Sequence, residues 1–144
     1  MKRLTIKIAL VLAFLPLMAS AQFADLDTAM ANLKRGFGSG DPQAIIAGLA
    51  TGDQVMLQFP GLVEQSGFFG RDQAAYLLDG LFNKVKPSGF EQQSARKHSS
   101  QGQYEIKATW TISENGHPSA RELYITMQNK NDRWSIASIR SAGK

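Results

Sequence analysis

The first half of the chain is patterned for helices. A stripe of apolar residues spaced by four, three and four positions predicts an amphipathic helix. The stripe consists of Leu26, Met30, Leu33 and Phe37. Asp25 or Asp27 can cap the start of this helix, and the glycines between positions 36 and 40 are expected to end it. Asp41-Pro42 then predicts a second helix, because aspartate is a good cap and proline suits the first helical position.

A third helix is predicted between Arg71 and Pro87, where the helical period returns. Its apolar positions are Ala74, Leu77, Leu78, Leu81, Phe82 and Val85. Pro87 is expected to end the helix, because proline disfavours helical geometry in the residue before it. Gly80 lies inside the pattern, where glycine weakens a helix by about 1 kcal/mol relative to alanine. We therefore expect a close packing contact on the turn that contains Gly80.

The remaining segments are patterned for strands. The alternation of apolar and polar residues is cleanest from Tyr104 to Ser113, which predicts a half-buried strand. Asn115-Gly116 is a strong turn signal, and residues 61–70 predict a short hairpin or loop. The alternation slips after Ile136, which predicts a bulge. The predicted strands cover residues 55–59, 90–99, 104–113, 123–127 and 134–139.

The order of these elements predicts the fold class. Two helices, one strand and a third helix are followed by a run of strands, which is typical of an α+β domain. We expect three helices packed on one face of a strongly curved, mainly antiparallel sheet. Residues 22–144 are long enough for one hydrophobic core and one domain.

The first 21 residues have the pattern of a signal peptide. A basic start at Met1-Lys2-Arg3 precedes an apolar run, and Ala19-Ser20-Ala21 offers the small residues that a signal peptidase accepts. The run, of about 15 residues, is shorter than the roughly 20 that span a bilayer. We therefore expect cleavage between Ala21 and Gln22, and export to the periplasm or the extracellular space.

Cleavage changes the charge of the protein. The full chain has 16 basic and 12 acidic residues, and loss of Lys2, Arg3 and Lys7 leaves 13 basic residues against 12 acidic ones. A net charge near neutrality gives no support to binding of nucleic acids or of anionic membranes. The chain has no cysteine, which excludes disulfides and a thiol nucleophile. After residue 21 no apolar run approaches membrane length, so no membrane association is expected after cleavage.

Several short motifs, in this order and spacing, are similar to a known superfamily. They are Ser39-Gly40-Asp41 with Ile45-Ile46-Ala47, Gly70-Arg71-Asp72-Gln73-Ala74, Leu81-Phe82 with Pro87 and Phe90, His98 with Gly102 and Tyr104, and Asn115-Gly116 with Arg121. Together they resemble the nuclear-transport-factor-2-like, or cystatin-like, α+β cone over roughly residues 23–140. Within it, the chain most resembles a family of small exported bacterial proteins of unknown function. The resemblance implies the fold and export, and no catalytic residues, because fold alone does not decide activity.

Residues suited to catalysis are sparse. An enzyme with this fold needs a carboxylate or histidine that faces an apolar pocket, where burial adjusts its pKa. The apolar faces of the clearest strands carry no such group beyond the Tyr104 hydroxyl. Asp53, His98 and His117 are candidates for a polar pocket rim, although Asp53 also fits a turn or cap. The histidines lack the HxxxH or HxH spacing of metal ligands, so we predict no catalytic residue, no metal site and no cofactor.

Aromatic residues are the remaining candidates for a binding site. Phe68 and Phe69 are adjacent and cannot both face inward on a strand, so one is expected at a pocket lip or an interface. Tyr104 and Trp110 fit the core, and alternatively the wall of a ligand pocket. We expect a non-enzymatic domain that binds a small apolar ligand or a protein partner. Two alternatives stay open: a pocket enzyme of the isomerase, dehydratase or hydrolase kind, and a homodimeric assembly module.

Overall fold

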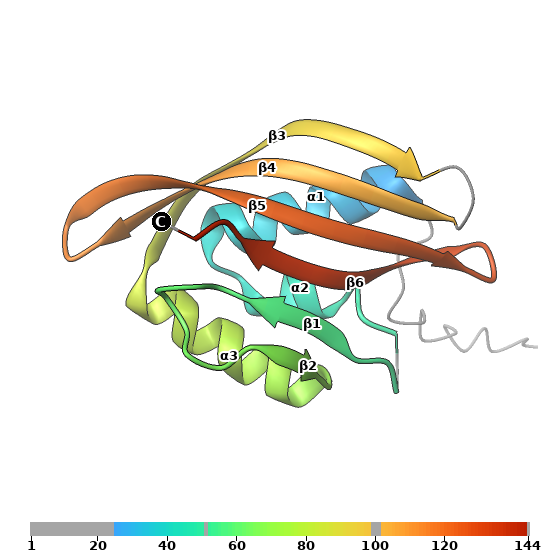
Figure 1. Ribbon diagram of the computed structural model, residues 1–144, viewed down its shortest axis with the longest axis horizontal. Helices are drawn as coiled ribbons and strands as arrows, with labels where there is room; N and C mark the ends of the chain where they lie inside the picture. Colours follow the sequence, from blue (N-terminus) through green and yellow to red (C-terminus); the bar gives the residue numbers. More distant parts are fainter. Residues whose placement is uncertain (1–24, 51, 99–101, 144) are drawn as a thin grey trace, which may run out of the picture.

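The computed structural model describes residues 25–50, 52–98 and 102–143. Within these residues, three helices lie on one face of a six-stranded sheet (Figure 1). The helices are α1 (Leu26–Ser39), α2 (Pro42–Ile46) and α3 (Arg71–Lys84). The strands are β1 (Val55–Gln58), β2 (Gly67–Phe69), β3 (Lys86–His98), β4 (Gln103–Glu114), β5 (His117–Lys130) and β6 (Arg133–Ser141). The expected cleavage site between Ala21 and Gln22 lies outside the described residues.

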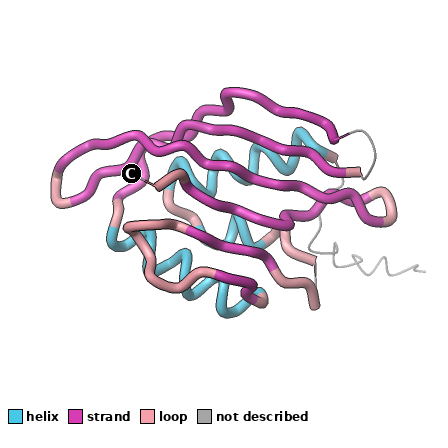
Figure 2. Tube along the Cα trace, viewed as in Figure 1, coloured by secondary structure: helices cyan, strands magenta, loops and turns pink. Residues whose placement is uncertain are grey.

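The sheet is curved and mainly antiparallel, as predicted (Figure 2). Its strand order is β2-β1-β6-β5-β4-β3, and of the five neighbouring pairs only β1 and β6 run parallel. The register shifts where Thr126 pairs with Ser138 and Met127 pairs with Ile136. Ala137 is therefore the extra residue of a bulge, which confirms the predicted slip after Ile136.

The predicted helix caps are present. The Asp25 carboxylate accepts a hydrogen bond from the Thr28 amide at 2.7 Å, and this bond lowers the pKa of Asp25. Gly40 ends α1 in the left-handed conformation, at a φ of 71°. Asp41 caps α2 through the Gln43 amide at 3.1 Å. Gly36, expected to help end α1, instead lies buried within the helix.

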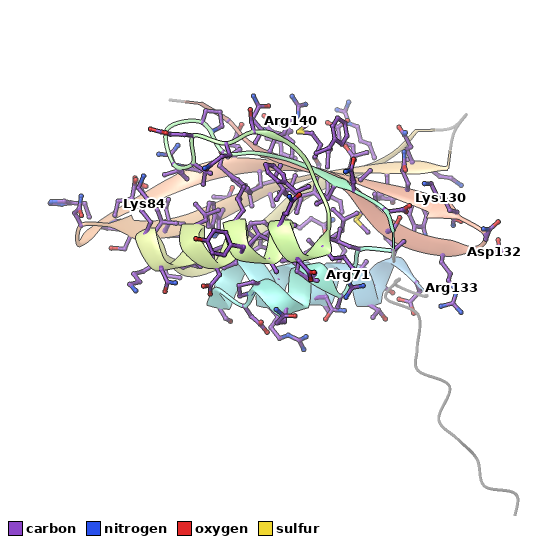
Figure 3. All side chains as sticks on the ribbon, turned by 90° about the horizontal axis from the view of Figure 1, so that it is seen from below. Arg71, Lys84, Lys130, Asp132, Arg133 and Arg140 are labelled. Atoms are coloured by element: carbon purple, nitrogen blue, oxygen red, sulfur yellow. The ribbon has the colours of Figure 1, made fainter. Side chains whose placement is uncertain are left out.

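The core is built around the Trp110 ring. This side chain is fully buried, and its Nε1 donates a hydrogen bond to the Phe37 carbonyl at 2.9 Å. The Phe37 and Phe82 rings meet it edge-on, at 5.5 Å and 6.1 Å between centroids. Phe59, Phe82 and Phe90 are also buried. Side chains thus fill the space between the sheet and the helices (Figure 3).

Three local features differ from the sequence-based expectations. Residues 67–69 form the short strand β2, paired with β1, within the segment predicted as a hairpin or loop. Strand β3 begins at Lys86, before Pro87, because it pairs with the far end of β4. Gly80 has no close packing contact: a Cβ built there would meet no atom within 4 Å. In the described ranges, none of the helices has the length and apolar character needed to span a membrane.

Candidate functional site

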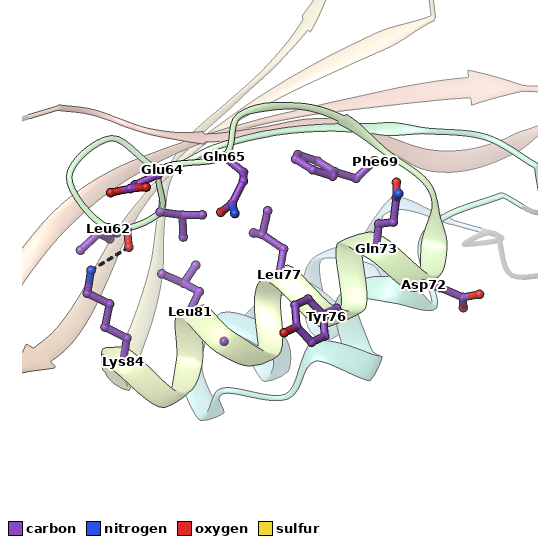
Figure 4. A pocket seen from close by; sticks show the side chains of 12 residues that line it. Leu62, Glu64, Gln65, Phe69, Asp72, Gln73, Tyr76, Leu77, Leu81 and Lys84 are labelled. Atoms are coloured by element: carbon purple, nitrogen blue, oxygen red, sulfur yellow. Dashed lines mark hydrogen bonds between the residues drawn. The ribbon is translucent and has the colours of Figure 1, made fainter.

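A groove runs along α3, between this helix and the loop that joins β1 to β2 (Figure 4). Its volume is about 730 Å³, within the roughly 300–1,000 Å³ typical of small-molecule sites. Most of its accessible surface is apolar. We call it the α3 groove. Its lining residues are Leu62, Val63, Glu64, Gln65, Phe69, Asp72, Gln73, Tyr76, Leu77, Gly80, Leu81 and Lys84.

The groove exists because α3 has apolar residues on two sides. Ala74, Leu78 and Phe82 face the core and are buried. Leu77 and Leu81 each lie one position earlier in the helix and are therefore rotated by about 100° toward the β1–β2 loop (Figure 4). The loop and Phe69 lie over this second side, where Leu81 is buried and Leu77 is partly exposed.

Hydrogen bonds at the two ends of α3 fix the helix against its neighbours. Arg71 Nη1 donates to the Leu49 carbonyl at 3.0 Å, at the start of the helix. Lys84 Nζ donates to the Leu62 carbonyl at 3.0 Å, at its end (Figure 4). Figure 3 shows these two side chains at opposite ends of α3. The Lys84 side chain, which lines the groove, therefore fixes the distance between the end of the helix and the β1–β2 loop.

The charged residues of the groove rim are two acids and one lysine. Glu64 and Asp72 are exposed and lie at opposite ends of the lining (Figure 4). The Lys84 ammonium is hydrogen-bonded to the Leu62 carbonyl. Tyr76 is 85% exposed, which makes it one of the two large apolar side chains most open to solvent in the described part of the chain. The arrangement offers apolar contact along its length, carboxylates at its ends and an aromatic ring at its mouth.

The structure separates the four aromatic ligand candidates. Phe69 lines the α3 groove. Phe68 is 68% exposed and, as its strand neighbour, lies on the opposite face of β2. Trp110 is fully buried in the core. Tyr104 is half-buried and meets the Trp134 ring edge-on at 5.8 Å, away from the groove.

The three polar rim candidates do not come together either. Asp53 precedes β1, and its carboxylate lies 3.7 Å from Lys130 Nζ. His98 ends β3 and pairs in register with the first residue of β4, whereas His117 starts β5 and pairs with the last residue of β4. The full length of β4 thus separates the two histidines. No group of three or more potential metal ligands occurs among residues 25–50, 52–98 and 102–143.

The titratable groups with shifted pKa values on the sheet lie outside the groove. The Tyr124 hydroxyl donates to Glu122 at 2.8 Å, and Lys107 Nζ lies 3.2 Å from the same carboxylate. These contacts lower the pKa of Glu122, the hydrogen bond from Tyr124 having the largest effect. The same bond raises the pKa of Tyr124. All three side chains are on the sheet face that points away from the helices.

Sequence reasoning finds Phe69 and misses most of the groove. The helical period places Leu77 and Leu81 in the core pattern; Leu81 is buried, and Leu77 packs against the core while staying partly exposed. Periodicity does not show that the same two residues also line a groove. The signal that could have found the groove is the width of the apolar arc of α3, together with Gly80 inside it. The opposite wall at residues 62–65 has no periodic pattern.

The layered arrangement defines the class of protein. Three helices on one face of a curved sheet form a nuclear-transport-factor-2-like fold. An NTF-2-like protein of unknown function from Shewanella oneidensis MR-1 superposes with a TM-score of 0.58 at 16% identity, covering 81% of this chain and 93% of that chain. A hypothetical protein with a ketosteroid isomerase-like fold from Catenulispora acidiphila, solved in complex with trimethylamine, has a TM-score of 0.60 at 12% identity. The match covers 79% of this chain and 83% of that one.

The chain belongs to the family described as "Domain of unknown function (DUF4783)", which matches residues 30–141. The crystal structure of a DUF4783 family protein from Bacteroides ovatus is similar, with a TM-score of 0.64 and 21% identity over 79% of this chain and 93% of that one. These findings confirm the resemblance predicted from the short motifs. No curated protein matches the chain in sequence.

Proposed function

We propose that this protein is an exported, non-enzymatic domain that binds a small apolar molecule in the α3 groove. The observation that carries the proposal is the second apolar side of α3, where Leu77, Gly80 and Leu81 face a hollow of about 730 Å³. Such a surface is stabilised by an apolar occupant, because burial removes it from water. The groove lining holds no histidine, and its acids lie at the rim, which favours binding over catalysis.

The charge of the rim favours one kind of ligand. Glu64 and Asp72 carry two negative charges at the rim, against the single positive charge that Lys84 keeps in its hydrogen bond to the Leu62 carbonyl. A carboxylate or sulfate on the ligand would meet these acids, whereas a neutral or cationic group would not be repelled. The proposed ligand is therefore an apolar molecule with a neutral or cationic polar end.

Export is the second part of the proposal. It is supported by the basic start, the apolar run and the Ala19-Ser20-Ala21 site at the beginning of the chain. An exported domain with an open apolar groove can meet its ligand directly in the surrounding medium or in the cell envelope.

Fluorescence titration of residues 22–144 with the neutral apolar dye N-phenyl-1-naphthylamine tests the binding. We expect saturable binding at one site, with displacement by octyltrimethylammonium and not by octanoate. Leu77→Gln is expected to weaken binding at least tenfold, since burying a leucine side chain contributes about 1.5–3 kcal/mol and about 1.4 kcal/mol is tenfold in affinity.

Asp79→Asn is the matched control, because Asp79 is exposed on α3 and does not line the groove. It is expected to leave dye binding unchanged. Equal binding by Leu77→Gln and the unmodified protein would exclude the α3 groove as the site. Native mass spectrometry of the protein recovered from its exported fraction distinguishes the occupants: a retained small molecule supports the proposal, and a retained peptide or a second copy contradicts it.

A further inference from the structure

Arg121 is a buried cation whose hydrogen-bonding capacity is mostly unused. The residue is 9% exposed and lies on the sheet face that points to the helices, beside Trp110 in the β4–β5 register. A guanidinium has five N–H donors. Here Nη1 donates one long hydrogen bond, of 3.4 Å, to the Pro60 carbonyl. Nη2 is 3.6 Å from Glu114 Oε2, beyond hydrogen-bond distance, and Nε has no partner among the described residues.

Two serine hydroxyls near Arg121 also lack a hydrogen-bond partner within the described residues. Ser119 precedes Arg121 by two positions on β5 and therefore faces the same side of the sheet. Ser141 ends β6 opposite Leu123, two positions after Arg121. Both hydroxyls are buried and lack a hydrogen-bond partner within the described residues. Buried polar groups are nearly always hydrogen-bonded, so three orphan groups at one end of the sheet indicate a missing acceptor.

The space for that acceptor adjoins Arg121. Two hollows, of about 310 and 290 Å³, both have Arg121 and Gly143 in their lining. Glu114 and Pro60 belong to the first, and Ser119 to the second. Neither shares a residue with the α3 groove. They form a second location, at the end of the sheet where β6 stops.

We propose that Arg121, with Ser119, forms a site that binds a carboxylate group. Nε and Nη2 lie along one edge of the guanidinium plane, and a carboxylate matches such an edge with two parallel hydrogen bonds. Glu114 already places one negative charge 3.6 Å from Nη2. An incoming carboxylate must therefore compete with Glu114 and is held by its two hydrogen bonds to the guanidinium, whereas a dianionic phosphate would add still more charge of the same sign. The inference is independent of ligand binding in the α3 groove.

The proton attached to Arg121 Nε reports directly on this site in ¹H–¹⁵N NMR spectra. Butyrate at constant ionic strength is expected to shift this signal saturably, while sodium chloride and the neutral analogue butyramide are not. A short peptide with a free C-terminus, compared with its amidated form, shows whether the carboxylate of a peptide end is also accepted. A signal that does not saturate with either carboxylate would overturn the proposal, since ordinary water would then satisfy Nε.

Variants test the role of each group. Arg121→Lys keeps the charge and loses the two-donor edge, so butyrate affinity, followed by calorimetry, is expected to fall at least tenfold. If this variant does not fold, Ser119→Ala and Glu114→Gln test the proposal instead. Ser119→Ala is expected to weaken butyrate binding about threefold. Glu114→Gln is expected to strengthen it several-fold, because the substitution removes the competing negative charge. Lys97→Gln on the exposed edge strand β3 is the control and should change nothing. Weaker binding by Glu114→Gln would contradict the proposed charge balance.

Discussion

Two glycines on α1 have the same conformation and different surroundings. Gly36 is buried where α1 crosses α2, and a Cβ built on it would overlap Ile45 Cγ1 and lie 3.2 Å from the Asp41 carbonyl. Gly38 has Phe90 Cβ as its nearest neighbour, at 3.7 Å. Neither glycine has a positive φ. The close approach of the two helices, and not backbone geometry, therefore requires glycine at position 36.

Gly36→Ala is expected to destabilise the protein. Overpacking a core costs about 1–3 kcal/mol, which exceeds the gain of up to about 1 kcal/mol from replacing glycine in a helix. Gly38→Ala has room for its methyl group and is expected to stabilise by up to about 1 kcal/mol. Urea unfolding of both variants measures the difference. Equal stabilities would mean that α1 and α2 do not pack as closely as described.

Tyr124 controls the ionisation of Glu122 on the outer sheet face. The hydrogen bond from the Tyr124 hydroxyl is the largest cause of the lowered pKa of Glu122. Tyr124→Phe is therefore expected to raise the pKa of Glu122 toward its ordinary value, measured by NMR titration of the Glu122 side-chain carboxyl. Lys34→Gln, on α1, is the control and should leave this pKa unchanged.

The same change alters the acid dependence of stability. A carboxyl whose pKa is lowered by folding stabilises the folded state above its unfolded pKa, and this contribution is lost as pH falls through the folded pKa. Tyr124→Phe should therefore show a smaller loss of stability than the unmodified protein when pH falls below the ordinary range of a glutamate. An identical pH profile would show that the bond contributes nothing in solution.

At the scale of elements, α3 combines packing with an open surface. Its core side holds the helix against the sheet, and its other side forms the floor of the groove. Arg71 and Lys84 fix its two ends. Gly80 is exposed on the groove side, and no atom lies within 4 Å of the position that a methyl group would take there. This glycine leaves open space in the middle of the groove floor at the expense of helix stability.

Gly80→Ala is therefore expected to stabilise the protein, by up to about 1 kcal/mol. Thermal unfolding followed by circular dichroism measures the effect as a raised Tm. Asn83→Ala, also exposed on α3 and outside the groove lining, is a control for the general effect of alanine on this helix. A lowered Tm for Gly80→Ala would indicate the close packing contact that the sequence pattern suggested.

The elements that the sequence predicted well are those whose pattern has a single cause. The alternation in β4 arises from one buried and one exposed face, and the caps at Asp25 and Asp41 act within a few residues. Strand β2 was not predicted as such, because three residues, one of them a glycine, form a strand only through pairing with β1. The groove was missed for the same reason. Its two walls, α3 and the β1–β2 loop, are brought together by tertiary packing and share no pattern along the chain.

At the scale of the whole molecule, the two proposed sites lie in different parts of the fold. The α3 groove is formed by one helix and the β1–β2 loop, and the Arg121 site by the ends of the long strands together with Pro60 and Gly61 of the same loop. The sheet face that points away from the helices carries charge pairs such as Lys107 with Glu122, and also the exposed Phe68 ring. The α3 groove gathers several apolar side chains around one hollow, whereas Phe68 is a single exposed ring outside it.

Cleavage of the signal peptide during export would remove most of the net positive charge of the whole chain. Expression of residues 1–144 in a bacterial host is expected to yield, outside the cytoplasm, a protein whose intact mass corresponds to a start at Gln22. Loss of Lys2, Arg3 and Lys7 leaves 13 basic residues against 12 acidic ones, so isoelectric focusing should place the product well below the pI of about 9.5 of the full chain. Ala21→Arg is expected to block cleavage, because the peptidase requires a small residue there, and Lys34→Gln is a control that leaves it unchanged. If the unmodified protein is recovered uncleaved from the cytoplasm, export is contradicted. Dye binding to purified residues 22–144 tests the groove separately from export.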